Sequence, residues 1–224
     1  MSDIFYYEHP FVCTDAVVFT IKTDEPDSYR KLPQTHLRVL LYKRDAEPFR
    51  GTWSLPGGFL DINELPEDNI RRKLSVKTEI DGIEKLFLEQ LFTFCDIERD
   101  PRTRVISIAY LGLMNESESQ GKAAWFDVRE IDKADLAFDH CKIIEMALLR
   151  LQSKILYTDI IFNLLPEQFT LTQLQNVYEA ILGYKEQAAN FRRKINHMVQ
   201  ETEYFTSDKG HRPAKLYKKA GSLK

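Results

Sequence analysis

The chain has 224 residues, of which 43% are hydrophobic and 29% are charged, and its formal net charge is -3. This is the composition of a globular protein with one large or two modest domains. No stretch approaches the roughly 20 apolar residues of a membrane-spanning helix, so we expect no membrane association. The acidic and aromatic start, MSDIFYYEHPF, lacks the features of a secretion signal, and we expect a cytoplasmic protein.

The cysteines predict neither a disulfide framework nor a metal site. Cys13, Cys95 and Cys141 stand apart in apolar segments, without the spacing of metal ligands and without an even count. We therefore expect buried, reduced thiols.

The first two thirds of the chain mixes strand and helix patterns. Runs of β-branched and aliphatic residues predict strands, and apolar residues at helical spacing predict helices. The segment KTDEPDSYRKLPQT predicts a polar loop after the first strand. The predicted strands are Phe11–Ile21, His36–Lys43, Leu86–Phe94, Val105–Leu113 and a short one beginning at Trp125, and the predicted helices run from about Pro66 to Lys77 and from Asp139 to Leu156.

The character of the chain changes after about Tyr157. A helix is predicted from Thr172, which can cap it, to Gly183, which ends it. A second helix follows over about Ala188–Met198, and the strand-like segments YFT and AKLYKKA then flank a turn. This is the order of elements in a winged helix-turn-helix, and we predict one domain over residues 1–156 and a second over residues 157–224.

Charge supports this division. Residues 183–224 contain ten basic and four acidic side chains, for a net +6, which leaves -9 for residues 1–182. An acidic body with a basic end is expected where that end meets a polyanion such as DNA.

One motif carries phosphate chemistry. The segment GFLDINELPEDNIRRKLSVKTEI resembles the Nudix box, G-x5-E-x7-R-E-U-x-E-E-x-G-U, where U is a bulky aliphatic residue. Gly58, Glu64, Arg72, Leu74 and Ile80 match its first Gly, first Glu, Arg and two aliphatic positions, and WSLPGG precedes the box as it does in the family. The resemblance implies the α/β class and, within it, the Nudix α/β/α sandwich.

The box departs from the family where the family binds metal. Lys73, Val76 and Lys77 replace three glutamates, and Glu79 replaces the final Gly. Mg²⁺ prefers carboxylate and phosphate oxygens, and the two lysines, spaced i, i+4 on one helix face, would repel it and attract phosphate instead. We therefore predict no catalytic residues, no metal site and no required cofactor.

Arginines predict where a phosphorylated ligand binds. RDPRTR resembles the segment that ADP-ribose pyrophosphatases and their regulator relatives carry between the box and the next strand, although Asp-Pro also favours an ordinary surface turn. The predicted ligand-binding residues are Arg44, Gly57, Gly58, Phe59, Arg99, Arg102 and Arg104. Phe59 or Phe138 is an aromatic that can stack an adenine, whereas His140 is interpreted as structural.

Polar and basic residues near the C-terminus predict DNA contacts. In a helix-turn-helix the second helix enters the major groove, where Arg reads guanine and Asn reads adenine, and the wing contacts phosphate or the minor groove. The plainer alternative is a solvated helix face beside a basic hairpin. The predicted DNA-binding residues are Asn190, Arg192, Arg193, Lys194, Lys209, Arg212 and Lys215.

Two further segments resemble the Nudix-related transcriptional regulators of the NrtR family, namely LAFDH and FNLLPEQFTLTQLQNVYEAI. With them, the resemblance covers nearly the whole chain. The resemblance implies a homodimeric repressor on a palindromic double-stranded DNA operator, with a Nudix domain that senses ADP-ribose or a related phosphorylated sugar in the regulation of NAD metabolism or sugar use.

Two alternatives stay open at this point. One is a residual ADP-ribose pyrophosphatase with an accessory tail, whose metal ligands would be Glu64 with Glu79 or Asp61. The other is a non-enzymatic Nudix module whose tail binds protein or RNA.

Overall fold

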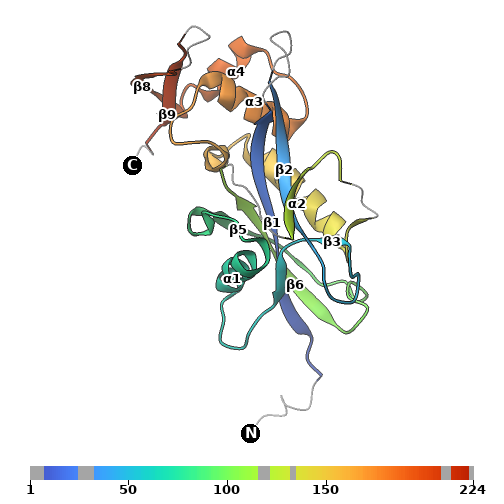
Figure 1. The fold of residues 1–224 in the computed structure, drawn as a ribbon. Helices are drawn as coiled ribbons and strands as arrows, with labels where there is room; N and C mark the ends of the chain where they lie inside the picture. Colours follow the sequence, from blue (N-terminus) through green and yellow to red (C-terminus); the bar gives the residue numbers. More distant parts are fainter. Residues whose placement is uncertain (1–7, 25–32, 116–121, 132–134, 208–212, 222–224) are drawn as a thin grey trace.

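A computed structural model describes residues 8–24, 33–115, 122–131, 135–207 and 213–221. The described chain forms a larger unit around a mixed sheet and, at one end of it, a smaller helical unit that finishes in a hairpin (Figure 1). This arrangement is the predicted α/β fold followed by a winged helix.

The sheet of the larger unit has the order β3-β2-β1-β6-β5, with β4 and β7 pairing to β1 and β2 respectively. β1 and β6 run parallel, and the other pairs are antiparallel. A 3-10 helix, η2 (Ile83–Lys85), precedes β5. The strands are β1 (Phe11–Asp24), β2 (Gln34–Lys43), β3 (Trp53–Ser54), β4 (Gly57–Phe59), β5 (Phe87–Phe94), β6 (Val105–Leu113) and β7 (Ala123–Asp127).

Alternation along the strands gives the sheet two apolar faces. On β1, Val17 and Phe19 belong to one core, and Ala16 and Val18 belong to the other. The helix α2 (His140–Lys154) packs on the first core through Ile143, Ala147 and Leu151. The helix α1 (Pro66–Thr78) packs on the second through Ile70 and Leu74. Two helices on opposite faces of one sheet make the α/β/α sandwich.

The smaller unit contains a helix-turn-helix and a wing. Its elements are η4 (Ile160–Leu164), α3 (Leu171–Leu182), α4 (Ala188–Ile195), β8 (Val199–Phe205) and β9 (Lys215–Lys219). The predicted cap at Thr172 is wrong, because Thr170 forms a capping box with Gln173 and the helix begins one residue earlier. Gly183 ends α3 at φ 84°, as predicted. α4 is shorter than predicted, because Val199 already pairs with Lys219 in the wing.

The two units share an apolar core and several hydrogen bonds. The core under α2 continues through Leu174, Val177 and Tyr178 of α3 to Phe191 of α4. Near the C-terminal end of α3, Gln152 donates to the Ile181 carbonyl at 2.9 Å and Arg129 to the Ala180 carbonyl at 3.1 Å. The Tyr178 hydroxyl donates to the Ile155 carbonyl at 2.9 Å. The smaller unit is therefore held by α2 and by residues near β7.

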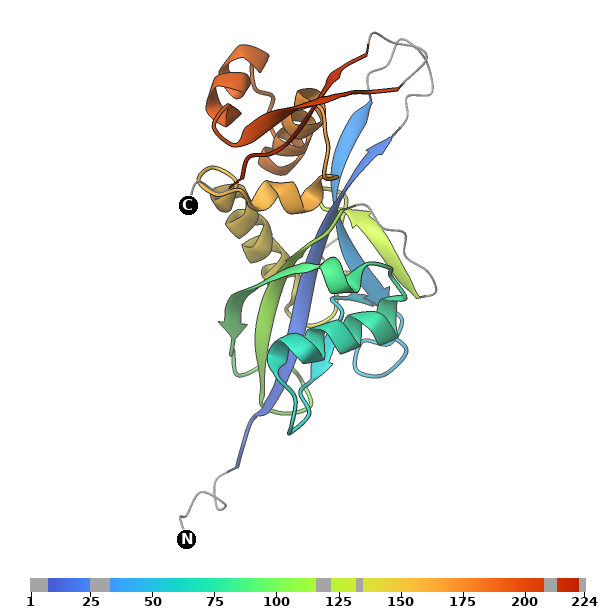
Figure 2. The same ribbon diagram turned by 90° about the vertical axis from the view of Figure 1, so that its left-hand side faces the viewer.

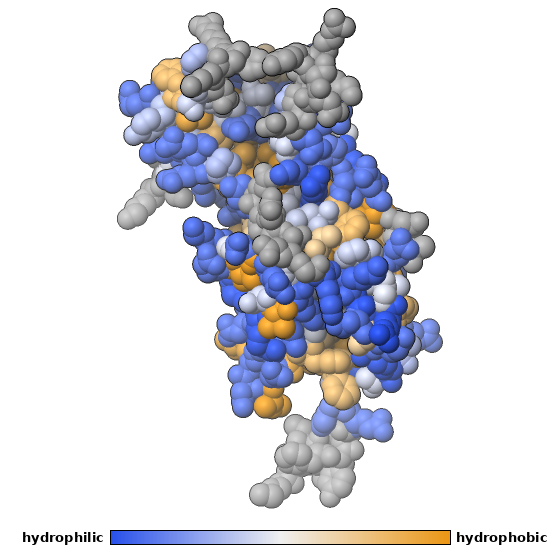
Figure 3. Space-filling model, viewed as in Figure 1, coloured by the Kyte–Doolittle hydropathy of each residue, from blue (hydrophilic) through white to orange (hydrophobic). Residues whose placement is uncertain are grey.

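The surface and the cysteines complete the description. The face seen in Figure 3 is largely hydrophilic, with scattered apolar side chains. No helix among the described residues is both long and apolar enough to cross a bilayer. Cys13 is buried, but Cys95 is exposed and Cys141 is half-buried, so the expectation of three buried thiols holds for one of them.

Candidate functional site

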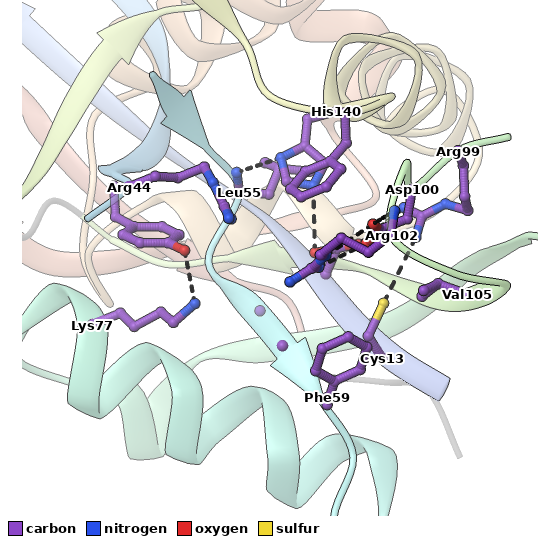
Figure 4. A pocket seen from close by; sticks show the side chains of 15 residues that line it. Cys13, Arg44, Leu55, Phe59, Lys77, Arg99, Asp100, Arg102, Val105 and His140 are labelled. Carbon is purple, nitrogen blue, oxygen red and sulfur yellow. Dashed lines mark hydrogen bonds and ion pairs between the residues drawn. The ribbon is translucent and has the colours of Figure 1, made fainter. Parts of the chain in front are cut away.

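One pocket brings together most of the predicted ligand residues. It lies where β1 meets β4, between the loop that joins β5 to β6 and the start of α2 (Figure 4). The backbone of β1 can be followed through the larger unit in Figure 2. Of the residues predicted to bind ligand, the pocket is lined by Arg44, Gly57, Gly58, Phe59, Arg99 and Arg102. Arg104 does not line it, and its buried Nη1 has no hydrogen-bond partner among the described residues.

The glycine pair is required by packing as well as by the pocket. A Cβ on Gly57 would lie 2.1 Å from the Thr14 carbonyl oxygen of β1, so only glycine allows β4 to pair there. Gly58 has φ +152°, and a Cβ on it would lie 3.1 Å from Cε of Lys73. Close packing therefore requires glycine at both positions, with β1 against Gly57 and the Lys73 side chain against Gly58, and both residues line the pocket.

Arg99 holds the pocket wall together. Its guanidinium is buried and bonds both oxygens of Asp139, at 3.0 and 2.8 Å, and lies 3.4 Å from Oδ2 of Asp15. Ser107 donates to the same Asp15 oxygen at 2.6 Å. Burial raises the pKa of Asp15, and Ser107 and Arg99 oppose that shift. Because its donors are engaged, Arg99 fixes the start of α2 against β1 more directly than it offers a free phosphate contact.

Arg44 and Arg102 are more available. Arg102 is held by Asp100 through a forked pair, at 3.0 and 2.7 Å, yet its side chain remains 43% exposed. Arg44 donates to the Pro48 carbonyl at 2.9 Å and stacks on the Phe138 ring, 4.8 Å from its centroid. Both guanidinium groups lie at the mouth of the pocket with unused donors.

The aromatic wall of the pocket is built on an unusual backbone. Phe138 has φ 54°, which a bulky residue rarely adopts, and it contacts Phe49, itself at φ 64°, with ring centroids 4.8 Å apart. Arg102 lies 5.5 Å from the Phe59 ring and 5.8 Å from the Phe138 ring. The two aromatics proposed for stacking thus flank one cation at the pocket mouth.

His140 has a structural role. The amide N–H of Leu55 donates to its Nδ1 at 2.9 Å, so the proton of the neutral ring lies on Nε2, which faces Oδ1 of Asp15 at 3.6 Å. Burial lowers the pKa of His140 to about 3. The ring is therefore neutral at pH 7 and joins the start of α2 to the segment between β3 and β4.

The frame of the Nudix box is intact. Glu64 accepts two hydrogen bonds from Arg72, at 2.6 and 2.7 Å, and a third from Asn69 at 2.7 Å. The hydrogen bond from Arg72 is the main reason that the pKa of Glu64 falls to about 2. Asp61 also pairs with Arg72, at 2.8 Å, so both acidic residues are already engaged.

One of the metal-binding positions of the box places a cation in the pocket. Lys77 lines the pocket and donates to the Tyr42 hydroxyl at 2.9 Å. Val76 is 73% exposed and faces solvent. Among the described residues, no group of three or more His, Cys, Asp or Glu side chains is placed to hold a metal ion.

The winged helix separates its predicted DNA contacts into two groups. Asn190, Arg192 and Arg193 are exposed on α4, whereas Phe191 and Ile195 of the same helix are buried. Lys194 is turned inward, where its ammonium lies 3.3 Å from Glu186 and 5.0 Å from the centre of the Tyr178 ring. Its charge is thus partly neutralised within the domain.

The wing supplies the other cations. A groove between α4 and the wing is lined by Arg192 of α4 and by Lys215 and Tyr217 of β9. Lys215 lies over the Phe205 ring, 4.7 Å from its centroid. The predicted contacts at Lys209 and Arg212 lie outside the described residues.

Several site residues have no counterpart in the sequence motifs. Asp15 and Asp139 bind Arg99, and Tyr42 receives the Lys77 ammonium. Asp15 had one signal, a single carboxylate in the apolar run FVCTDAVVFTI, which requires a buried partner. That partner is Arg99, distant in sequence, and only the fold brings the two together.

Two family models match the chain. A NUDIX domain matches residues 32–146, and an NrtR DNA-binding winged helix domain matches residues 161–218. The chain is 34% identical to the ADPR responsive transcriptional repressor NtrR of Acinetobacter baylyi, over 95% of this chain and 83% of that protein. It is 32% identical to an ADP-ribose pyrophosphatase of Methanocaldococcus jannaschii, over 62% of this chain and 73% of that protein.

Solved structures of Shewanella oneidensis NrtR are similar over both units. The structure in complex with a 27mer DNA has a TM-score of 0.75 and 34% identity, covering 93% of each chain. The isolated NUDIX domain in complex with ADP ribose has a TM-score of 0.55 and 32% identity, covering 67% of this chain and 94% of that one. The chain therefore belongs to the NrtR family of transcriptional regulators, in which a Nudix domain is joined to a DNA-binding winged helix.

Proposed function

We propose that this protein is a repressor that binds a palindromic operator as a homodimer and responds to ADP-ribose or a related phosphorylated sugar. The single observation that carries the proposal is the combination, in one chain, of a Nudix pocket with cations at its metal-binding positions and a winged helix with exposed arginines. Such a regulator acts in the cytoplasm, on genes of NAD metabolism or sugar use.

The pocket supports the ligand assignment. Arg44, Lys77 and Arg102 reach it from three separate elements, and their charged ends lie around one space (Figure 4). Phe59 and Phe138 supply aromatic faces at its mouth. Forked guanidinium donors suit phosphate, and aromatic faces suit a nucleobase. The relatives described above include a domain in complex with ADP ribose, which makes that ligand the first to test.

The winged helix supports the DNA assignment. Asn190 and Arg193 present exposed amide and guanidinium groups on α4, and Lys215 of the wing shares a groove with Arg192 of the same helix. This is the division expected between base contacts from the second helix and backbone contacts from the wing. Since one such unit reads one half-site, a dimer on a palindrome is the natural assembly.

The alternative of a residual pyrophosphatase requires a metal site. Glu64 and Asp61 are both bound to Arg72, and Glu79 sits at the C-terminal end of α1 in the left-handed conformation. No described group of three acidic, His or Cys side chains replaces the lost glutamates. The relative that is an ADP-ribose pyrophosphatase favours this alternative, and the charges of Lys73 and Lys77 weigh against it.

α2 links the ligand pocket to the winged helix. At its start, Asp139 binds Arg99 and His140 accepts from Leu55. Near its end, Gln152 donates to the Ile181 carbonyl of α3. If α2 can take two positions, a ligand that binds one of them more tightly would shift the winged helices toward the matching placement. A ligand with equal affinity for the two positions would shift nothing.

Two binding experiments test the proposal. Isothermal titration of the full chain with ADP-ribose, for wild type and Arg102→Ala, should show binding that Arg102→Ala weakens by about tenfold or more. Equal binding by the two proteins would remove Arg102 from the site, and no binding of any phosphorylated ribose would overturn the ligand assignment. Arg99→Ala is expected to lower stability as well, because it leaves Asp15 and Asp139 buried without their cation.

A further inference from the structure

Two lysines occupy the surface where a Nudix hydrolase holds its metal. Lys73 and Lys77 lie one turn apart on α1, which runs alongside β4. Lys77 lines the pocket, where its ammonium donates to the Tyr42 hydroxyl at 2.9 Å, and Figure 4 shows the side chain of Lys77 extending from α1. Lys73 passes over Gly58, because a Cβ on that glycine would be 3.1 Å from its Cε and 3.3 Å from its Nζ.

The residues around these lysines do not fit Mg²⁺. That ion requires oxygen ligands, usually carboxylates and phosphates. The nearest carboxylates are committed, since Asp15 is bound by Ser107 and Arg99 and Glu64 is bound by Arg72. A divalent ion placed here would also meet Lys73 and Lys77 themselves. The described residues therefore disagree with the metal that the fold implies.

The same residues fit an anion. Burial, together with Arg72 and Lys77, lowers the pKa of Lys73, which means that positive charges are already crowded on this side of the pocket. Burial alone would raise the pKa of Tyr42, but the Lys77 ammonium lowers it below its ordinary value. A ligand phosphate would relieve this crowding and accept from the ammonium donors that remain unused.

We infer that Lys73 and Lys77 replace the metal in ligand binding. Their ammonium groups bind the oxygens of the diphosphate directly, so ligand binding needs no divalent cation. An ammonium group carries a compact charge and three donors on a flexible stem. The Lys73 stem already lies across Gly58, which lines the pocket, so its ammonium is close to the place where a bound phosphate would lie. The inference rests on the proposed function, because it assumes that the pocket takes a diphosphate.

A structural role for Lys77 is the competing explanation. In that case its hydrogen bond to Tyr42 would position β2 against α1, and removal of the charge would lower stability without a specific effect on phosphate. Lys77→Met keeps the length and apolar stem of the side chain and removes only the ammonium. Lys85→Met is the matched control, since Lys85 is an exposed lysine of the same unit that does not line the pocket.

The test is isothermal titration of the full chain with ADP-ribose, in buffer with EDTA and in buffer with excess Mg²⁺. Wild type should bind with the same Kd in both buffers. Lys73→Met and Lys77→Met should each raise Kd by about tenfold or more, while their melting temperatures and the Kd of Lys85→Met stay at the wild-type values.

The outcomes separate this inference from the proposed function. If wild type binds ADP-ribose only with Mg²⁺, or if Lys73→Met and Lys77→Met both bind as wild type does, the lysines do not replace the metal and the proposed ligand stands. If the variants lose affinity for free ribose, which carries no phosphate, by the same factor as for ADP-ribose, the lysines have a structural role instead. If wild type binds ADP-ribose in neither buffer, the ligand assignment itself is overturned, and this inference with it.

Discussion

The two faces of the central sheet differ in where their cores end. The core under α1 closes within the Nudix unit, on Ile70, Leu74 and the side chains of β1 and β2 that face them. The core under α2 runs on without a break into α3 and α4. The cations that we propose bind phosphate lie on the α1 side and at the pocket, and the winged helix is attached on the α2 side. Alternating residues of a single strand, β1, belong to the two cores. The sheet therefore lies between the α1 helix and the winged helix, whereas α2 contacts both the pocket and the winged helix.

The largest expected effect concerns the DNA-binding end. Arg193→Glu or Arg192→Glu should abolish specific operator binding, because each half-site loses a contact of about 1–3 kcal/mol and gains a charge that repels phosphate. Fluorescence anisotropy on the duplex upstream of the protein's own operon measures this. Lys142→Glu makes the same charge change on the exposed surface of the Nudix unit and should bind as wild type. If Arg193→Glu and Arg192→Glu both bind as Lys142→Glu does, α4 is not the recognition helix.

The wing offers a milder version of that test. Lys215→Ala should weaken binding to operator and random duplex alike and reduce the dependence of affinity on salt by about one counterion per site. A loss confined to the operator would instead show that Lys215 reads bases.

The next effect concerns the α1 face. Wild type should not hydrolyse ADP-ribose with Mg²⁺, whereas an ordinary enzyme turns over about once per second or faster. Restoring the box with Lys73→Glu, Val76→Glu and Lys77→Glu together should create Mg²⁺ affinity that wild type lacks, because carboxylates then replace the two lysines beside the pocket and a third carboxylate stands next to them on α1. Wild-type turnover at the enzymatic rate would contradict the regulator account, and a triple variant without Mg²⁺ affinity would contradict the charge argument.

The junction between pocket and α2 should respond to pH. The folded-state pKa of His140 is about 3, far below its ordinary value of 6.5, so neutral His140 favours the folded state above pH 6.5. That stability is lost progressively as pH falls from 6.5 toward 3, by up to about 1.4 kcal/mol per pH unit, or roughly 2 kcal/mol at pH 5.

Denaturant unfolding between pH 7 and pH 5 measures this effect. The free energy of unfolding should fall less steeply for His140→Gln than for wild type. His197→Gln, which changes an exposed histidine of the winged helix, should keep the wild-type slope. Equal slopes for all three proteins would mean that His140 titrates normally.

The smallest expected effect lies where α2 meets α3. Gln152→Ala removes the donor to the Ile181 carbonyl and should cost about 1 kcal/mol of stability. It should also reduce the change in operator affinity that ADP-ribose causes, while ADP-ribose itself binds with unchanged Kd. Gln168→Ala removes an exposed glutamine near the start of the winged helix and serves as the control. An unchanged ligand response in Gln152→Ala would show that coupling passes elsewhere, for example through Arg129.

Much of this architecture could be predicted from local patterns. Alternation and helical spacing place β6 and the start of α1 at the predicted residues, and the order of the last elements predicts the winged helix. The box identifies the fold because its Gly, Glu and Arg lie close together in sequence, within one strand, loop and helix, and its Glu and Arg contact one another. Its departures at Lys73 and Lys77 identify the two cations that we propose bind phosphate, since residues one turn apart on a helix share a face.

Other parts could not be predicted, because they depend on contacts distant in sequence. Arg99 looks like a free phosphate ligand until the fold brings Asp15 and Asp139 to it. Lys194 resembles its exposed neighbours on α4 until Glu186 and Tyr178 are placed beside it. Buried partners of this kind leave little local signal, whereas the exposed Arg192 and Arg193 are recognisable from helix position alone.

The most direct test of the central claim measures operator binding and ligand chemistry in one sample. Labelled operator duplex is titrated with the full chain, with and without ADP-ribose, in Mg²⁺ buffer, and the nucleotide is analysed afterwards. A regulator that senses without cutting should prefer operator over random duplex, change its operator affinity by about fivefold or more when ADP-ribose is added, and leave the ADP-ribose intact. Superimposed binding curves with and without ADP-ribose, or conversion of the ligand to AMP and ribose phosphate, would contradict the account.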